Sequence, residues 1–189
     1  MIYICLLRGI NVSGQKAMKM AALRTSFESL GLKDIMTYVQ SGNVVFSTAA
    51  KTKPASLGAR IKAQIATDFG FDVPVVIIKG DEMGKVVKGN PFVKEKGIDM
   101  ARLYVTFLSA APEASAVTKL KSVAAGVDRF HVSGTNVYLH CPKSYGETKL
   151  SNNTLERVLS VSATTRNWKT VTTLHDMTLP AAHGEEQSS

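Results

Sequence analysis

The sequence predicts an α+β fold made of two related ferredoxin-like (split βαβ) halves, with an extra helix at the C-terminal end. Two observations lead to this class. Over the first 80 residues, segments follow one another as strand, helix, strand, strand, helix, strand, which is the order of the split βαβ motif. The second half then repeats the start of this order with similar residues, as expected of an internal duplication.

Six elements are expected in the first half, because their apolar residues follow either a strand or a helix pattern. Residues 2–7 form a continuous apolar run, typical of a strand buried on both faces. The helices have apolar residues every three or four positions; the first ends at Gly31 and the second opens at Pro54. A tight turn around Gly42 joins the middle strands. The expected elements are residues 2–7, 20–30, 35–39, 44–46, 54–69 and 73–78.

The second half echoes the first in its opening strand and its hairpin. Residues 104–108 parallel residues 3–7. The segment 130–138 shares an aromatic residue, a Val, a Ser-Gly pair and an Asn-Val pair with the segment 38–46. Two hairpins with so many common residues indicate that the halves are related.

The remaining elements and the domain boundaries follow from these matches. Helices are expected over residues 112–124, from Leu150 onward with Ser151 as the cap, and after Arg166. We divide the chain into a first α+β repeat (1–80), a connecting segment (81–98), a second repeat with the C-terminal helices (99–179) and a flexible tail (180–189).

The composition allows a sizeable core and a modest attraction for anions. Apolar residues make up 44% of the chain, and no run reaches the roughly 20 apolar residues that span a bilayer. The net charge of +8 is spread as +3 over residues 1–48, +3 over 49–100 and +2 over 101–189. No segment is therefore a basic arm, and the charge tolerates a polyanionic partner without requiring one.

The other residue patterns favour a cytoplasmic protein without a metal or a cofactor. The N-terminus has no basic leader, and its apolar stretch is too short for a secretory signal. Cys5 and Cys141 form no disulfide framework, and the four His residues show no metal-ligand spacing. No carboxylate pair suited to hydrolysis stands out. We expect no membrane partner and leave a homodimer open.

Five ordered motifs between residues 3 and 174 carry a family resemblance. They are LLRGINV at 6–12, TYVQSGNVVF at 37–46, NPF at 90–92, KLSN at 149–152 and TRNWKTV at 165–171. On these motifs the chain resembles the bacterial family called domain of unknown function 1697. The resemblance implies a cytosolic protein of tandem, related α+β halves. It implies no substrate, cofactor or catalytic residue.

The first candidate site is the loop after the opening strand, where Arg8, Asn11 and Lys16 stand between a strand and a helix. Its two glycines have the spacing of the phosphate-binding loop G-x-x-x-x-G-K-[ST]. However, Gln15 stands where the Lys belongs, Lys16 comes one residue late, and Ala17 after it offers no hydroxyl for a magnesium ion. A nucleoside triphosphatase is therefore not expected. Backbone N–H groups at a helix start and two basic side chains still favour an anion; the alternative is a loop that only turns the chain.

The second candidate is the hairpin turn of the first half, with Tyr38, Gln40, Ser41 and Asn43. In a split βαβ unit the first strand pairs with the third, which brings Arg8 near this turn. An Arg, an Asn, a Gln and a Tyr at one sheet edge would form a polar patch for a phosphate or a base. The alternative is an ordinary turn, because Ser, Gly and Asn are common turn residues.

The third candidate is the C-terminal block, with Lys149, Arg166 and Asn167. Arg166 can stack on a ring, pair with a carboxylate or reach a phosphate. Lys149 precedes a helix start and offers a further anion contact. The neighbouring Trp168 is better explained as an anchor of the last helix in the core.

These candidates favour a noncatalytic binding protein whose ligand carries phosphate, either a nucleotide or a nucleic acid. Two alternatives stay open. One is an enzyme acting on a small anionic metabolite, with Arg8 and Arg166 as clamps and Tyr38 as a proton donor. The other is a scaffold or self-associating protein without a small ligand. The first hypothesis predicts that Arg8→Ala removes binding and leaves the melting temperature nearly unchanged, and it requires the three candidate segments to meet in space.

Overall fold

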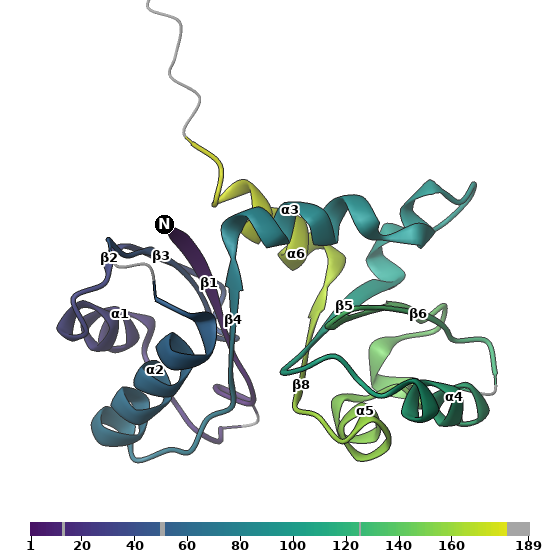
Figure 1. The fold of residues 1–189 in the computed structure, drawn as a ribbon, viewed down its shortest axis with the longest axis horizontal. Helices are drawn as coiled ribbons and strands as arrows, with labels where there is room; N and C mark the ends of the chain where they lie inside the picture. The colour runs from purple at the N-terminus through teal and green to yellow at the C-terminus, as the bar shows by residue number, and fades with distance from the viewer. Residues whose placement is uncertain (13, 50–51, 125, 181–189) are drawn as a thin grey trace, which may run out of the picture.

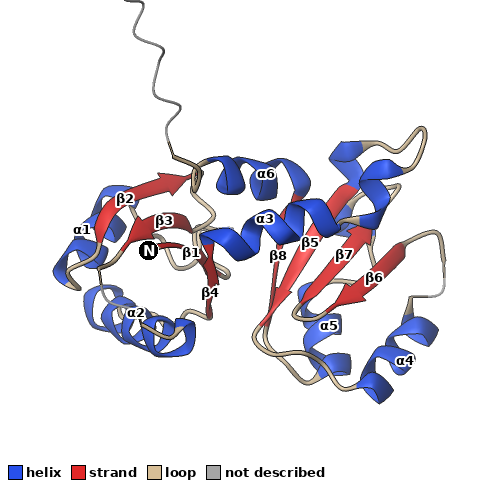
Figure 2. Cartoon of the chain, turned by 45° about the horizontal axis from the view of Figure 1, so that its top comes forward, coloured by secondary structure: helices blue, strands red, loops and turns tan. Residues whose placement is uncertain are grey.

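The computed structural model describes residues 1–12, 14–49, 52–124 and 126–180. These residues form a mixed α/β protein with two four-stranded antiparallel sheets and six α-helices (Figures 1 and 2). The first half contains β1 (Ile2–Leu7), α1 (Met20–Ser29), β2 (Lys33–Tyr38), β3 (Asn43–Ser47), α2 (Pro54–Phe69), β4 (Val75–Lys79) and α3 (Gly80–Gly89). The second half contains β5 (Leu103–Leu108), α4 (Ala114–Val123), β6 (Arg129–Ser133), β7 (Asn136–His140), α5 (Asn152–Leu159), β8 (Ala163–Asn167) and α6 (Trp168–Asp176).

Both sheets have the same strand order, with the first strand of each half next to the third. The orders are β2-β3-β1-β4 and β6-β7-β5-β8. In each half, the same backbone bond joins the end of the first strand to the residue just before the third. The Leu7 N–H donates to the Gly42 oxygen and the Leu108 N–H donates to the Thr135 oxygen, each at 2.8 Å. The expected pairing of the first strand with the third is therefore confirmed.

The described residues form three apolar cores, and one of them joins the two halves. One core lies between the first sheet and helices α1 and α2, and a second lies between the other sheet and helices α4 and α5. The third is shared by both halves and contains side chains from β1 and β3, from β5 and β7, and from helices α3 and α6. Helices α3 and α6 lie side by side across the junction (Figures 1 and 2). Because this shared core is buried, the relative placement of the halves is part of the fold.

Two elements differ from the sequence-based expectation. Helix α3 occupies a segment that we expected to be a connection; only Met83 and Val86 of it are buried, so its apolar stripe is short. Strand β8 occupies a segment expected to precede the last helix without being a strand. Its sequence, ATTRN, is mostly polar because it lies between the two halves and its side chains form specific polar contacts.

The C-terminal end of the described chain contains the last expected helix. Helix α6 begins at Trp168, in agreement with the last helix expected after Arg166. The tail expected at 180–189 lies outside the described residues except for Pro180. No helix in the described part of the chain is long and apolar enough to span a membrane.

Candidate functional site

Arg166 of β8 connects the second half to the first, and its guanidinium donates to four oxygen acceptors. Its Nε donates to Asn43 Oδ1 at 2.5 Å, and its Nη2 donates to the backbone oxygens of Leu7 at 2.6 Å and Ser41 at 3.1 Å. Its Nη1 donates to the Thr165 oxygen at 2.9 Å. Burial lowers the pKa of the guanidinium to about 10, so the group stays charged at neutral pH. Arg166 therefore acts as a charged clamp between the halves.

Asn43 completes this clamp from the first half. Its side chain is fully buried. The Nδ2 group donates to the Tyr38 oxygen at 2.9 Å and to Ser41 Oγ at 3.0 Å, while Oδ1 accepts from Arg166. Both ends of this side-chain amide are thus engaged within the protein, as a buried amide requires. The hairpin turn and the C-terminal block therefore meet in space. Their polar groups bond to each other, so these groups are already occupied within the protein.

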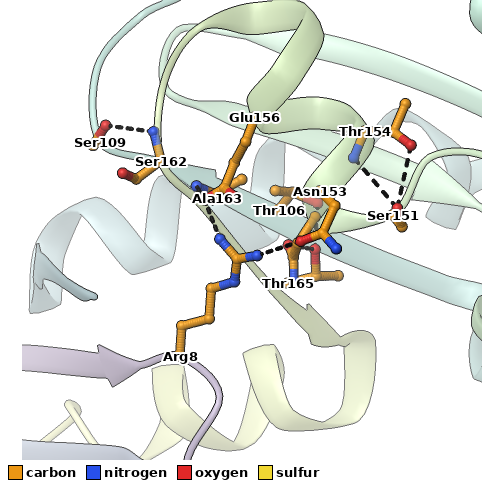
Figure 3. Close-up of polar contacts among 11 residues, drawn as sticks. Arg8, Thr106, Ser109, Ser151, Asn153, Thr154, Glu156, Ser162, Ala163 and Thr165 are labelled. Atoms are coloured by element: carbon orange, nitrogen blue, oxygen red, sulfur yellow. Dashed lines mark hydrogen bonds and ion pairs between the residues drawn. The ribbon is translucent and has the colours of Figure 1, made fainter. Parts of the chain in front are cut away.

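Arg8 makes a second polar contact between the halves (Figure 3). Its Nη1 forms an ion pair with Glu156 Oε1, and its Nη2 donates to Asn153 Oδ1 at 2.7 Å. Both partners belong to helix α5. Glu156 Oε1 also accepts from the Ala163 N–H at 2.9 Å. The charge of Arg8 is therefore matched by a carboxylate, which reduces its attraction for a phosphate.

We expect Arg8→Ala to lower the free energy of unfolding by about 0.5–1 kcal/mol, because the pair with Glu156 is partly exposed and screened by water. Glu156→Ala should cost more, since it also removes the acceptor of the Ala163 N–H. Urea unfolding of both variants measures this order. Equal losses, or a larger loss for Arg8→Ala, would contradict it.

A row of hydroxyl groups lies next to the Arg8 contact, between β5, β8 and α5 (Figure 3). The hydroxyls of Thr106 and Thr165 are 2.7 Å apart, and Thr165 donates to Asn152 Oδ1 at 2.7 Å. Ser151 caps the same helix by accepting from the Thr154 N–H at 3.4 Å. These bonds fix the position of α5, which presents its polar side chains to Arg8.

Asn11 ties the loop after β1 to the hairpin of the first half. Its Nδ2 donates to the Gln40 oxygen at 2.8 Å and the Met18 oxygen at 2.9 Å, and its Oδ1 accepts from the Met18 N–H at 2.7 Å. Its φ of +54° is left-handed, a conformation that Asn tolerates better than most residues. The first two candidate segments therefore touch through Asn11. Lys16 bonds elsewhere, donating to the Asp72 oxygen at 2.6 Å.

A pocket of 450 Å³ opens where this loop reaches helix α1. Its lining residues are Asn11, Ala17, Met18, Lys19, Met20 and Gln40. Lys19 is the residue before the helix, and its side chain makes no capping bond. The first turn of α1 contains no acidic residue. The pocket therefore lies at the positive end of the helix dipole, and Lys19 and Met20 at the helix start both line it.

The sequence interpretation did not include Lys19. The signal that could have found it is its position directly before the first helical turn, where a residue with an oxygen-bearing side chain usually stands. A lysine there cannot accept a bond from the helix N–H groups, so it leaves them free for an anion.

Comparison with known proteins places the chain in a family. A model of the proteins of unknown function called DUF1697 matches residues 1–138. The chain belongs to this family. No curated protein matches the chain.

A solved structure among those that match is similar to this DUF1697 protein over nearly its whole length. It is the conserved bacterial protein SP0830 from Streptococcus pneumoniae, with a TM-score of 0.73 and 21% sequence identity. The match covers 94% of this chain and 98% of that chain. At this identity the likeness concerns the fold, and it covers both halves.

The remaining predicted site residues of the DUF1697 chain have other contacts. Tyr38 is partly buried against the shared core. Asn167 caps helix α6 by accepting from the Thr170 N–H at 2.8 Å. Lys149 lines a separate pocket of 310 Å³ in the second half, which also contains the carboxylates of Asp128 and Glu147. None of these three predicted residues lines the pocket at the start of α1.

The described residues contain neither a metal cluster nor an activated thiol. No group of three or more His, Cys, Asp or Glu side chains is placed to hold a metal ion. Burial raises the pKa of the Cys5 thiol, and it raises the pKa of Cys141 to about 11. Both thiols are therefore protonated at neutral pH and poor nucleophiles.

Proposed function

We propose that this DUF1697 protein is a noncatalytic binding protein for a phosphate-bearing ligand, a nucleotide or a nucleic acid, and that the ligand binds in the pocket at the start of α1. The observation that carries the proposal is the uncapped N-terminus of α1 beside the Lys19 ammonium. Helix N-termini of this kind bind phosphate through backbone N–H groups. Gln40 adds a side-chain amide to the pocket, which can bond the rest of the ligand.

The charges around the pocket support an anionic ligand. None of the six residues that line it carries a carboxylate. The exposed ammonium of Lys19 forms no salt bridge with another described residue. Arg8 and Arg166, in contrast, are engaged between the halves. We therefore assign phosphate binding to Lys19 and the helix start, and assign the two arginines to the junction.

Calorimetric titration with a panel of nucleotides, single-stranded RNA and double-stranded DNA tests the proposal. Each titration is run at low and at moderate salt. Binding of a polymer should weaken steeply as salt rises, because counterions are released. Binding of one nucleotide with little salt dependence would identify a small-molecule site.

Lys19→Ala is expected to weaken the binding of whichever ligand responds by about tenfold, since it removes one charge-assisted contact. The matched control is Lys33→Ala, which removes an exposed lysine from β2 of the same half and should leave binding unchanged. An equal loss of affinity in both variants would mean that Lys19 acts only through the overall positive charge of the protein. An absence of binding across the whole panel would reject the proposal.

We also propose that the two halves are copies of one ferredoxin-like unit, related by duplication. The matching registers support this: Tyr3 lies opposite Phe46 and Lys79, and Tyr104 lies opposite Leu139 and Asn167. Each half then adds a helix directly after its fourth strand, α3 after β4 and α6 after β8. The helix expected as an extra element at the C-terminus has a counterpart in α3.

A further inference from the structure

Strand β4 has a free edge that faces the second half. It pairs only with β1, and it is the last strand in the order of its sheet. Among the described residues, no backbone hydrogen bond joins the segment 75–78 to a partner other than β1. The four side chains of this segment are apolar, and the first three of them are partly exposed. A free apolar edge of this kind is a template for another strand.

The backbone groups that face outward can be assigned from the pairing with β1. The Arg8 N–H donates to the Pro74 oxygen at 3.1 Å, so the hydrogen-bonded pairs alternate from this residue onward. The N–H and C=O groups of Val76 and Ile78 then point toward β1. Those of Val75 and Ile77 point to the free edge, and they are the groups that a further strand would bond.

Two neighbouring pockets lie along this edge, and together they are called the groove below. Their volumes are 630 Å³ and 420 Å³, and both are lined by Val76, Ile77, Leu108 and Thr135. The larger pocket runs beside helix α2, and the smaller one runs beside helix α3. An added strand would therefore find a pocket on each face for its alternating side chains.

The charged residues of the groove are mostly basic. Lys53 and Lys62 line the larger pocket and Lys85 the smaller one, while Glu82 is the acidic residue among the lining residues. Lys62 pairs with Asp72 at 2.8 Å. Lys53 also stands before helix α2, whose first turn has no acidic residue and no side-chain cap. The potential in the groove thus favours negative charge.

We propose that the β4 edge binds an extended acidic segment of a partner protein, which adds to the first sheet as a fifth strand. Main-chain bonds to Val75 and Ile77 hold the segment. Its apolar side chains enter the groove, and its carboxylates face Lys53 and Lys85. This site is separate from the pocket at the start of α1, so the two proposals stand or fall independently.

The test uses a labelled seven-residue peptide, Glu-Glu-Val-Val-Glu-Glu-Val, which places carboxylates and apolar side chains on both faces of an added strand. The charge control is the matching Val and Lys peptide, with Lys in place of each Glu. Backbone amide exchange in the full-length protein is followed by NMR. On saturation with the acidic peptide, exchange at Val75 and Ile77 should slow by roughly tenfold or more. Exchange at Val76 and Ile78 should change little, because these amides already bond to β1. This alternation distinguishes an added strand from general stabilisation.

The double variant Lys53→Glu with Lys85→Glu should weaken the acidic peptide by about tenfold, while Lys33→Glu on the opposite sheet edge should not. Three results would overturn the proposal: no saturable binding, equal binding of the Val and Lys peptide, or amide changes away from β4. Protection of the same amides that rises with protein concentration, without peptide, would also overturn it, because the edge would then belong to a second copy of the chain.

Discussion

Arg166→Ala is expected to lower the free energy of unfolding by about 2–4 kcal/mol, one of the two largest effects predicted for a single change in this protein. The guanidinium satisfies Asn43 Oδ1 and the backbone oxygens of Leu7 and Ser41. Its removal leaves Asn43 Oδ1 and the Leu7 oxygen, whose bonds to Arg166 are partly buried, without this donor. Each such loss costs about 1–3 kcal/mol before water compensates, while the exposed Ser41 oxygen can bond to water instead.

Urea unfolding followed by circular dichroism measures this loss. The matched control is Arg157→Ala, which removes an exposed arginine from helix α5 and should change stability by less than about 0.5 kcal/mol. Arg166→Lys should fall between wild type and Arg166→Ala, because an ammonium cannot reproduce the planar fork of donors. A loss below about 1 kcal/mol for Arg166→Ala would show that the clamp does not stabilise the junction.

Gly42→Ala is expected to destabilise the protein by about 3 kcal/mol, the sum of a backbone cost and a packing cost. The φ of Gly42 is +81°, and a Cβ atom there would lie 2.7 Å from Leu7 Cβ and 2.9 Å from Ile10 Cδ1. The left-handed backbone costs an L-residue about 1–2 kcal/mol, and the overpacking adds about 1–3 kcal/mol. The close approach exists because the hairpin turn packs directly on the end of β1.

Gly134→Ala separates these two contributions. Gly134 belongs to the corresponding hairpin of the second half and has a φ of +57°. A Cβ atom there would have no neighbouring atom within 4 Å. The variant should therefore show only the backbone cost of about 1–2 kcal/mol. Thermal unfolding of both variants checks the difference, and equal losses would mean that packing around Gly42 relaxes without cost.

The sequence was sufficient for the elements whose apolar pattern is strong. The helix stripes and strand runs of the first half agree with α1, α2 and β1 to β4 within a few residues. The pattern failed for β8, because Thr164 and Thr165 are polar residues used in a buried or partly buried strand. It failed for α3 as well, since ten residues with two buried apolar side chains give little periodicity.

The arrangement of the candidate segments could be predicted in part, because a sequence does not show how one half docks on the other. The split βαβ order predicts that the end of β1 lies beside the hairpin turn, and Arg166 bonds to both of these segments. The ion pair of Arg8 with Glu156 depends on how one half docks on the other, which no local pattern encodes. From the sequence alone, Arg8 is therefore taken as free to bind an anion, because its partner Glu156 lies in the other half.

The most direct test of the account is an NMR titration of the full-length protein with adenosine triphosphate, followed through the backbone amides. The largest amide chemical-shift changes are expected at Met20, Ala21 and Ala22, the first three residues of α1, which has no side-chain cap. Lys19→Ala should reduce these shifts and leave the fold intact. Largest shifts at Asn43 and Arg166 would contradict the account, because they would make the junction clamp the ligand site.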